Sequence, residues 1–459
     1  MTETINTAAT SASTASATGQ FDQNTDHASA LRFITCGSVD DGKSTLIGRL
    51  LVDTRAVLQD QLAGVTKSGE TDLALLTDGL SAEREQGITI DVAYRYFNTD
   101  ARKFIIGDAP GHEQYTRNMV TAASSADAAV VLVDATKLEW QNPDLALLPQ
   151  TRRHSLLVHL LRVHSLVFAV NKLDAVADPA VAFANIARAL KQFAADAGIA
   201  VTATIPVSAL KGYNVVTRED GWAGYDGPSL LQLLEQLPNT PADTNLPLAF
   251  PVQWVEKFHD SAITTQGRRV FWGRVATGDA KVGAQVQILP SGQLATIAQV
   301  IDHARAPKAV HAGLSAGITL DREVDASRGD WIVAAPVAAQ VAEDDFDTPS
   351  AQPSWPSSRN LTATVAWMDN EPLVPGRVYW ALHGHRWVKA KAQRVVHRLN
   401  VNTLDKDETT QLEPNAIGVV DFALQEAIPV AAFAQSRALG SLILVDTASN
   451  ATAAAVLAQ

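Results

Sequence analysis

Cysteine is almost absent from this chain of 459 residues, because Cys36 is the only one. A single thiol excludes an internal disulfide bond and a cysteine-based metal cluster within one chain, and it is typical of a reducing compartment such as the cytoplasm. Cys36 lies in an apolar run that predicts a strand. We therefore expect a small buried side chain there rather than a redox group.

Long apolar runs and an excess of positive charge are also missing. No uncharged apolar run reaches the ~18 residues that a membrane span requires, so we expect no membrane segment. The formal net charge of −12 argues against nucleic-acid binding over a wide basic face. Residues 1–28 contain no lysine or arginine and fit neither a signal nor a transit peptide, so we expect a disordered leader.

The distribution of apolar residues predicts about three domains. From 29 to 240, strand-like runs alternate with helical patterns, which indicates a mostly parallel sheet with helices on both faces. A proline-rich segment at 238–251 changes this pattern to short strands separated by turns. We therefore expect an α/β domain at 29–240, followed by two antiparallel β-barrel domains at 246–343 and 359–459.

The most informative segment is residues 37–45, with the sequence GSVDDGKST. It fits G-x-x-x-x-G-K-[ST], the P-loop whose backbone N–H groups surround phosphates and whose lysine reaches the terminal phosphates. A predicted strand at 31–36 precedes it and a predicted helix at 43–51 follows, which is the order that the motif requires. The expected phosphate-binding residues are Gly37, Ser38, Val39, Asp40, Asp41, Gly42, Lys43, Ser44 and Thr45.

Two later segments bear on the choice of base. Asn171, Lys172, Leu173 and Asp174 directly follow a predicted strand. A carboxylate there can accept two hydrogen bonds from the N1–H and 2-amino groups of guanine, a donor pair that adenine lacks, and an asparagine amide can meet O6 or N7. The second segment follows the next predicted strand and consists of Ser208, Ala209 and Leu210. The pattern predicts GTP as the ligand.

Between these motifs lie residues suited to the γ-phosphate and Mg²⁺. In the segment Asp108, Ala109, Pro110 and Gly111, the carboxylate can hold the hydration shell of Mg²⁺ and the glycine lets a backbone N–H approach the γ-phosphate. Ser44 and Thr89 are the hydroxyls expected to complete the Mg²⁺ shell. Segments held in this way collapse on hydrolysis, so the region is expected to act as a switch.

His112 follows Gly111 and is the candidate catalytic residue, which would orient the attacking water. No arginine finger in the same chain can be assigned from the sequence. We therefore expect slow intrinsic turnover that a partner or ligand accelerates.

Together these motifs resemble the translation-factor branch of the GTPases, in which a P-loop GTPase domain precedes two antiparallel β barrels in an elongation-factor-like arrangement. Within that branch the chain is most similar to the GTPase subunits of sulfate adenylyltransferase. Ser38 and Arg153 favour this family, because elongation factors usually show GHVD and QTREH at these places, and Asp41 also sets the loop apart from theirs. The resemblance rests on GSVDDGKSTLIGRLL (37–51), DGLSAEREQGITIDVAYRYF (78–97), PGHEQYTRNM (110–119), QTRRHS (150–155), SRGD (327–330), AWMDNEPLVPG (366–376) and DTASNATAA (446–454).

The resemblance implies that GTP hydrolysis drives formation of adenosine 5′-phosphosulfate and pyrophosphate from ATP and sulfate. It implies GTP and Mg²⁺ as cofactors and a smaller catalytic subunit as partner, in a heterodimer or a higher assembly, with no membrane and no nucleic acid. The alternative is a translation elongation factor that delivers aminoacyl-tRNA. The chain departs from the family in two places: Ala109 replaces the usual threonine, and the connection at 136–149 is several residues longer, where a partner contact could differ.

Overall fold

The computed structural model describes residues 30–57, 91–112, 115–257, 269–302, 305–336 and 354–459, together with 66–67, 70–71, 73 and 76. The expected leader at 1–28 and the candidate metal ligand Thr89 lie outside these residues. None of the helices in the described part of the chain is both long and apolar enough to cross a membrane.

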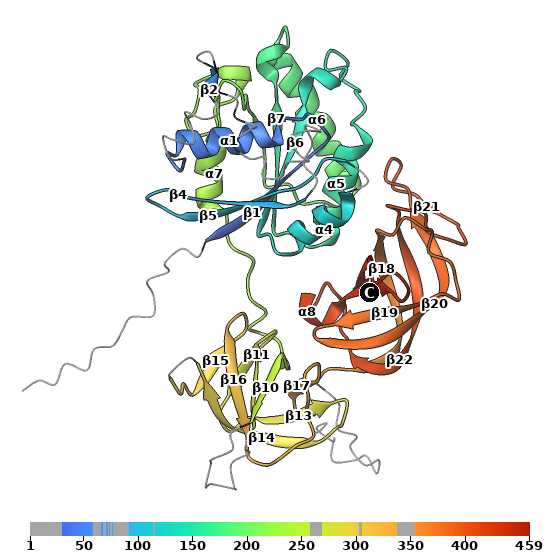
Figure 1. The fold of residues 1–459 in the computed structure, drawn as a ribbon. Helices are drawn as coiled ribbons and strands as arrows, with labels where there is room; N and C mark the ends of the chain where they lie inside the picture. Colours follow the sequence, from blue (N-terminus) through green and yellow to red (C-terminus); the bar gives the residue numbers. More distant parts are fainter. Residues whose placement is uncertain are drawn as a thin grey trace, which may run out of the picture.

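A six-stranded sheet organises the N-terminal part of the chain (Figure 1). Neighbouring strands pair in parallel, except for the edge strand β4, which is antiparallel to β5. β6 and β7 are buried at every position, which explains why their sequences are almost continuously apolar. In spatial order the strands are β4 (Ala93–Asn98), β5 (Lys103–Asp108), β1 (Leu31–Cys36), β6 (Ala128–Asp134), β7 (Ser165–Asn171) and β8 (Ala203–Pro206).

Helices cover both faces of this sheet (Figure 1). On one face α1 (Lys43–Asp53) and α7 (Leu230–Gln236) pack their leucines against β1 and β6. The other face is covered by α4 (Thr116–Ser124), α5 (Pro149–Leu160) and α6 (Pro179–Asp196). Short elements complete the region: β2 (Thr66–Lys67), β3 (Glu70–Thr71), η3 (Ala135–Lys137), η4 (Leu173–Ala175) and η5 (Trp222–Gly224).

The helix α6, which begins at Pro179, illustrates how the sequence determines these elements. The Asp178 side chain accepts from Val181 N at 3.1 Å, and Pro179 occupies the first turn, where its missing N–H is not needed. Ile186 and Leu190, four residues apart, are fully buried on one face. Gly198 lies just beyond the end of α6 with φ +67, a left-handed conformation that glycine adopts at little cost.

A seven-stranded antiparallel sheet follows, and its two ends approach one another at Gly273, where a Cβ atom would lie 2.4 Å from Pro251 O. Its side chains alternate between buried and exposed positions around a core of valines, isoleucines and Phe271. The strand order is β10 (Trp254–Lys257), β11 (Arg269–Arg274), β16 (Ser315–Leu320), β14 (Leu294–Ile301), β13 (Gln285–Leu289), β17 (Trp331–Ala334) and β9 (Ala249–Pro251), beside the pair β12 (Asp279–Lys281) and β15 (Ala309–His311).

The C-terminal domain is a closed antiparallel barrel, because β19 pairs with β20 as well as with β23. Along β20 the lysines 389 and 391 are exposed, whereas Val388, Ala390 and Ala392 are buried, as expected for a strand with one solvated face. The elements are β18 (Ser357–Trp367), β19 (Val378–His383), β20 (Arg386–Leu399), β21 (Lys406–Asp407), β22 (Ile417–Pro429), α8 (Arg437–Gly440), β23 (Ser441–Asp446) and β24 (Thr452–Ala458).

The predicted fold class is thereby confirmed, and the domain boundaries given above stay predictions. The barrel of β18–β24 contacts the helices of the first domain through arginines. Arg152 on α5 donates to Asn402 O at 2.7 Å, and Arg117 on α4 donates to Met368 O at 3.3 Å. The helices that flank the predicted phosphate site therefore also touch the C-terminal barrel.

Candidate nucleotide-binding site

The predicted site residues gather at the carboxyl ends of the parallel strands, where ligands bind in open α/β sheets (Figure 1). The P-loop follows β1, Asp108 ends β5, Asn171 ends β7, and the segment Ser208–Leu210 follows β8. Residues separated by more than 160 positions in the sequence thus form one edge of the sheet.

The backbone of the P-loop depends on its glycines. Gly42 has φ +91, and a Cβ atom there would lie 2.4 Å from Asn171 Nδ2, so no other residue fits this place. Lys43 begins α1, is only 6 % exposed, and donates from Nζ to Ser38 O at 2.7 Å and Gly37 O at 3.3 Å. Burial lowers the pKa of Lys43. The loop carbonyls thus hold the ammonium group inside the curve of the loop, where phosphates are expected.

The metal-binding prediction agrees with the contacts of Ser44 and Asp108. Ser44 Oγ donates to Asp108 Oδ2 at 3.2 Å, and Thr35 Oγ1 donates to Asp108 Oδ1 at the same distance. Asp108 is 2 % exposed. A hydroxyl and a carboxylate side by side are the oxygen donors that Mg²⁺ takes beside water and phosphate, so the residues present fit this ion.

The segment after Asp108 approaches the P-loop closely. Ala109 is fully buried and donates from its N–H to Thr35 O at 3.1 Å, and the neighbouring Pro110 is buried as well. A Cβ atom at Gly111 would lie 2.6 Å from Lys43 Nζ and 2.9 Å from the carbonyl carbon of Ser38. Glycine is therefore required there, and its backbone lies beside the lysine that the phosphates need.

His112 is partly buried beside this contact. Its Nε2 atom is inaccessible and has no hydrogen-bond partner among the described residues, which leave out 113 and 114. The ring stands edge-on to Tyr115, with 6.3 Å between centroids. The role of His112 in catalysis stays a prediction.

On the base side, Asn171 joins two loops. Its Nδ2 donates to Asp41 O at 2.8 Å, and its Oδ1 accepts from Ala209 N at 3.0 Å. The amide that the sequence pattern directs to guanine O6 or N7 thus links the P-loop to the Ser208–Leu210 segment. Both polar atoms of the Asn171 amide therefore bind protein groups, and the side chain supports the loops that form the base site.

The remaining base-side residues differ in solvent exposure. Leu173 is fully buried, whereas Asp174 is exposed and Leu210 is 61 % exposed. Ser208 Oγ accepts from Lys211 N at 3.0 Å, and Arg49 Nε donates to Ala209 O at 3.2 Å. The carboxylate of Asp174 can therefore receive a base that enters from solvent.

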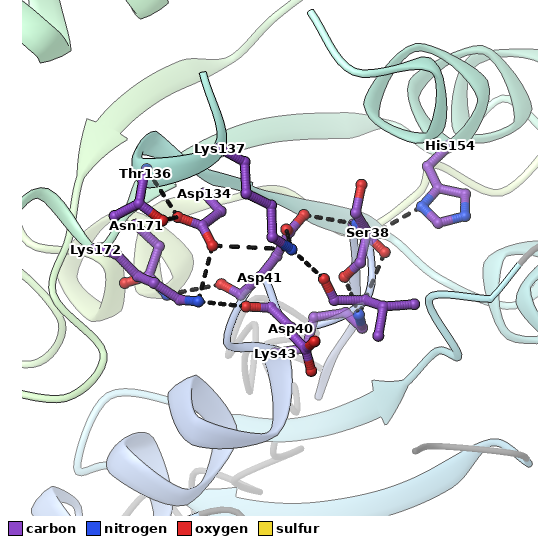
Figure 2. A network of polar contacts seen from close by, with 12 residues as sticks. Ser38, Asp40, Asp41, Lys43, Asp134, Thr136, Lys137, His154, Asn171 and Lys172 are labelled. Atoms are coloured by element: carbon purple, nitrogen blue, oxygen red, sulfur yellow. Dashed lines mark hydrogen bonds and ion pairs between the residues drawn. The ribbon is translucent and has the colours of Figure 1, made fainter. Parts of the chain in front are cut away.

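Three further residues of the site had no role predicted from the sequence: Asp134, Lys137 and His154 (Figure 2). His154 Nδ1 accepts from Gly37 N at 3.1 Å, and burial lowers the pKa of this imidazole to about 3, which keeps it a neutral acceptor. Lys137 Nζ lies 3.0 Å from Asp41 Oδ1. Asp134 directly follows an apolar strand, as Asp108 and Asn171 do, and that position is the signal that could have revealed it.

A P-loop and an NKLD motif joined at one sheet edge, with antiparallel β domains after them, define a GTP-binding protein of the translation-factor class. The chain matches the elongation factor Tu GTP-binding domain over residues 28–241 and the C-terminal domain of the eEF1A type over 360–457.

Within this class the chain is similar to proteins named as subunits of sulfate adenylyltransferase. The chain is 42% identical over 431 residues to sulfate adenylyltransferase subunit 1 of Laribacter hongkongensis, covering 92% of this chain and 83% of that one. The same subunit of Citrobacter koseri is 39% identical over 442 residues, covering 94% and 87%. The chain therefore belongs to the sulfate adenylyltransferase subunit 1 family, as its motifs predicted. The term subunit 1 implies a partner subunit.

A longer relative shares the same region. The bifunctional enzyme CysN/CysC of Xylella fastidiosa is 45% identical over 433 residues, covering 93% of this chain. This chain spans 65% of the length of that relative. The similarity to it therefore concerns the region that the two chains share.

Proposed function

We propose that this chain is the GTPase subunit of sulfate adenylyltransferase. It hydrolyses GTP to GDP and phosphate, and this reaction drives formation of adenosine 5′-phosphosulfate and pyrophosphate from ATP and sulfate in a smaller catalytic partner subunit. The observation that supports this most directly is the joined guanine-nucleotide site, in which Asn171 connects the P-loop to the Ala209 backbone, in a member of this family. The single buried cysteine supports a cytoplasmic location.

The residues of the site divide the work of hydrolysis. Lys43 and the P-loop N–H groups hold the phosphates, and Asp174 accepts the guanine donors. Ser44, Thr89 and, through water, Asp108 would hold Mg²⁺, which supplies positive charge at the β- and γ-phosphates. His112 orients the water that attacks the γ-phosphate. Catalysis of this kind is mainly positioning and electrostatic stabilisation.

Coupling is required because a phosphate–sulfate anhydride is unstable, so its formation needs a second, downhill reaction. A conformational cycle can supply the link, since moving a two-state element from 1:99 to 99:1 takes about 5.5 kcal/mol of differential binding. α5 offers a route for such a change. It carries His154, which holds the P-loop, and Arg152, which donates to Asn402 O of the C-terminal barrel.

The test is a coupled assay on the chain purified together with its catalytic subunit. We expect GTP turnover to rise in proportion to pyrophosphate release when sulfate is added in the presence of ATP. A complex that carries Lys43→Ala serves as the control and should lose both the GTP turnover and its coupling. Binding of aminoacyl-tRNA, with no response to sulfate and ATP, would instead support an elongation factor.

A further inference from the structure

Asp41 is a negatively charged residue inside the loop that receives a triphosphate. Its side chain is 0 % exposed, and Oδ2 accepts from Ser38 N at 2.6 Å. Oδ1 lies 3.0 Å from Lys137 Nζ. Burial raises the pKa of this carboxyl, and Lys137 opposes that rise by its charge and its hydrogen bond, followed by Lys43. The carboxylate therefore depends on nearby cations to stay ionised in the fold.

Without a dedicated cation, this carboxylate would work against nucleotide binding. A buried carboxylate beside the phosphates would repel them, and its attraction would compete for the ammonium of Lys43. Lys43 is the residue whose charge the terminal phosphates need. Within the described part of the chain, Asp41 forms its ion pair with Lys137, which is 34 % exposed and is the second residue of the 136–149 connection.

Lys137 is itself held in place from two sides (Figure 2). Its Nζ donates to Val39 O of the P-loop and lies 3.8 Å from Asp134 Oδ2. Asp134 in turn is oriented by Thr136, whose N and Oγ1 donate to its Oδ1 at 2.9 and 2.6 Å. Asp134 Oδ2 also lies 2.8 Å from Lys172 Nζ. Alternating charges thus run from the P-loop to the NKLD motif.

We propose that Lys137 is a positioning residue for GTP: it neutralises the buried Asp41 carboxylate, so that the loop keeps its shape and the ammonium group of Lys43 stays available to the phosphates. The inference rests on the proposed binding of GTP and adds a residue to that site. It also gives a role to Asp41, one of the residues that separate this loop from that of elongation factors.

The test compares single and double charge variants of the full-length chain, read as the dissociation constant of a fluorescent GTP analogue. We expect Lys137→Met to bind about tenfold more weakly or worse, because it leaves a buried carboxylate without its cation. Lys137→Gln keeps a hydrogen-bond donor and removes only the charge, so it should weaken binding similarly. Lys137→Arg keeps the charge and should retain most of the affinity.

The decisive variant is Asp41→Asn combined with Lys137→Met. Removing both charges should restore the affinity to within about threefold of the natural chain, a recovery that the loss of a merely structural contact would not give. Lys191→Met, on the exposed face of α6, is the matched control and should bind normally.

Two results would overturn the inference: normal affinity in Lys137→Met and Lys137→Gln, or a double variant as weak as Lys137→Met. If Lys137→Met is unfolded by circular dichroism, the Lys137→Gln pair with Asp41→Asn gives the same comparison. Failure of the natural chain to bind the GTP analogue would count against the proposed function itself. The two failures are therefore distinguishable.

Discussion

The ion pairs at the nucleotide site differ in burial from an exposed ion pair on the C-terminal barrel. The carboxylates of Asp41 and Asp134 are 0 % and 1 % exposed. On the barrel, by contrast, Arg394 and Asp421 are 69 % and 22 % exposed. A buried charge that loses its partner is strongly destabilised, whereas an exposed pair contributes about 0–1 kcal/mol. The charges of the site are therefore matched to each other and to a charged ligand, whereas the exposed pair Arg394–Asp421 mainly keeps the barrel surface solvated.

The largest expected effect comes from removing the central cation of the site. Lys43→Ala should abolish GTP binding, because neither the P-loop N–H groups nor the remaining cations replace an ammonium group at the terminal phosphates. Isothermal titration of GTP into the purified chain measures this, and circular dichroism checks the fold. If Lys43→Ala still bound GTP, binding would not depend on the buried ammonium group of Lys43.

Asp174→Asn changes the ligand rather than removing it. The exposed carboxylate is expected to pair with two guanine donors, so an amide should weaken GTP binding by up to about 10⁴-fold. Xanthosine triphosphate, whose 2-oxo group complements the amide, should become the better ligand. Competition between the two nucleotides measures the switch, with Asp196→Asn on α6 as the control. An unchanged preference for GTP would refute the base assignment.

His112→Ala is expected to separate turnover from binding. Loss of the group that orients water should lower GTP turnover by about 10²–10⁴-fold, while the P-loop and base contacts keep the affinity for GTP. Single-turnover phosphate release and nucleotide titration measure the two quantities. Normal turnover would remove the catalytic role of this residue.

The smallest effect is expected on the barrel. Arg394→Ala removes an exposed ion pair with Asp421, which still accepts from Thr362 Oγ1 at 2.7 Å. The free energy of unfolding should therefore fall by no more than about 1 kcal/mol, and GTP affinity should not change. Urea unfolding measures the first and nucleotide titration the second. A larger fall in the free energy of unfolding would contradict the expectation that this exposed ion pair contributes little to stability.

The fold and the motif-bearing half of the site could be predicted because their signals are local. The strand Leu31–Cys36 and the helix that starts at Lys43 follow from a short apolar run and a P-loop. β6 and β7 likewise coincide with continuous apolar runs, since both strands are buried on both faces.

The other half of the site depends on contacts across the sheet. Lys137 lies 96 positions from Asp41, and His154 lies 117 positions from Gly37. No periodicity connects residues so far apart, because the distance between them is set by strand order and helix packing. The QTRRHS segment carries the resemblance to the family without revealing that its histidine accepts a P-loop N–H.

The burial of Cys36 has a practical consequence for thiol labelling of the protein. Its thiol is fully buried in β1 directly before the P-loop, and burial raises its pKa to about 12. Only the thiolate reacts with maleimides, so the folded chain should resist alkylation. A cysteine introduced at a chosen surface position can then carry a dye without removal of the native one. Conversely, the rate at which Cys36 itself is slowly alkylated would report how often β1 opens and exposes the thiol.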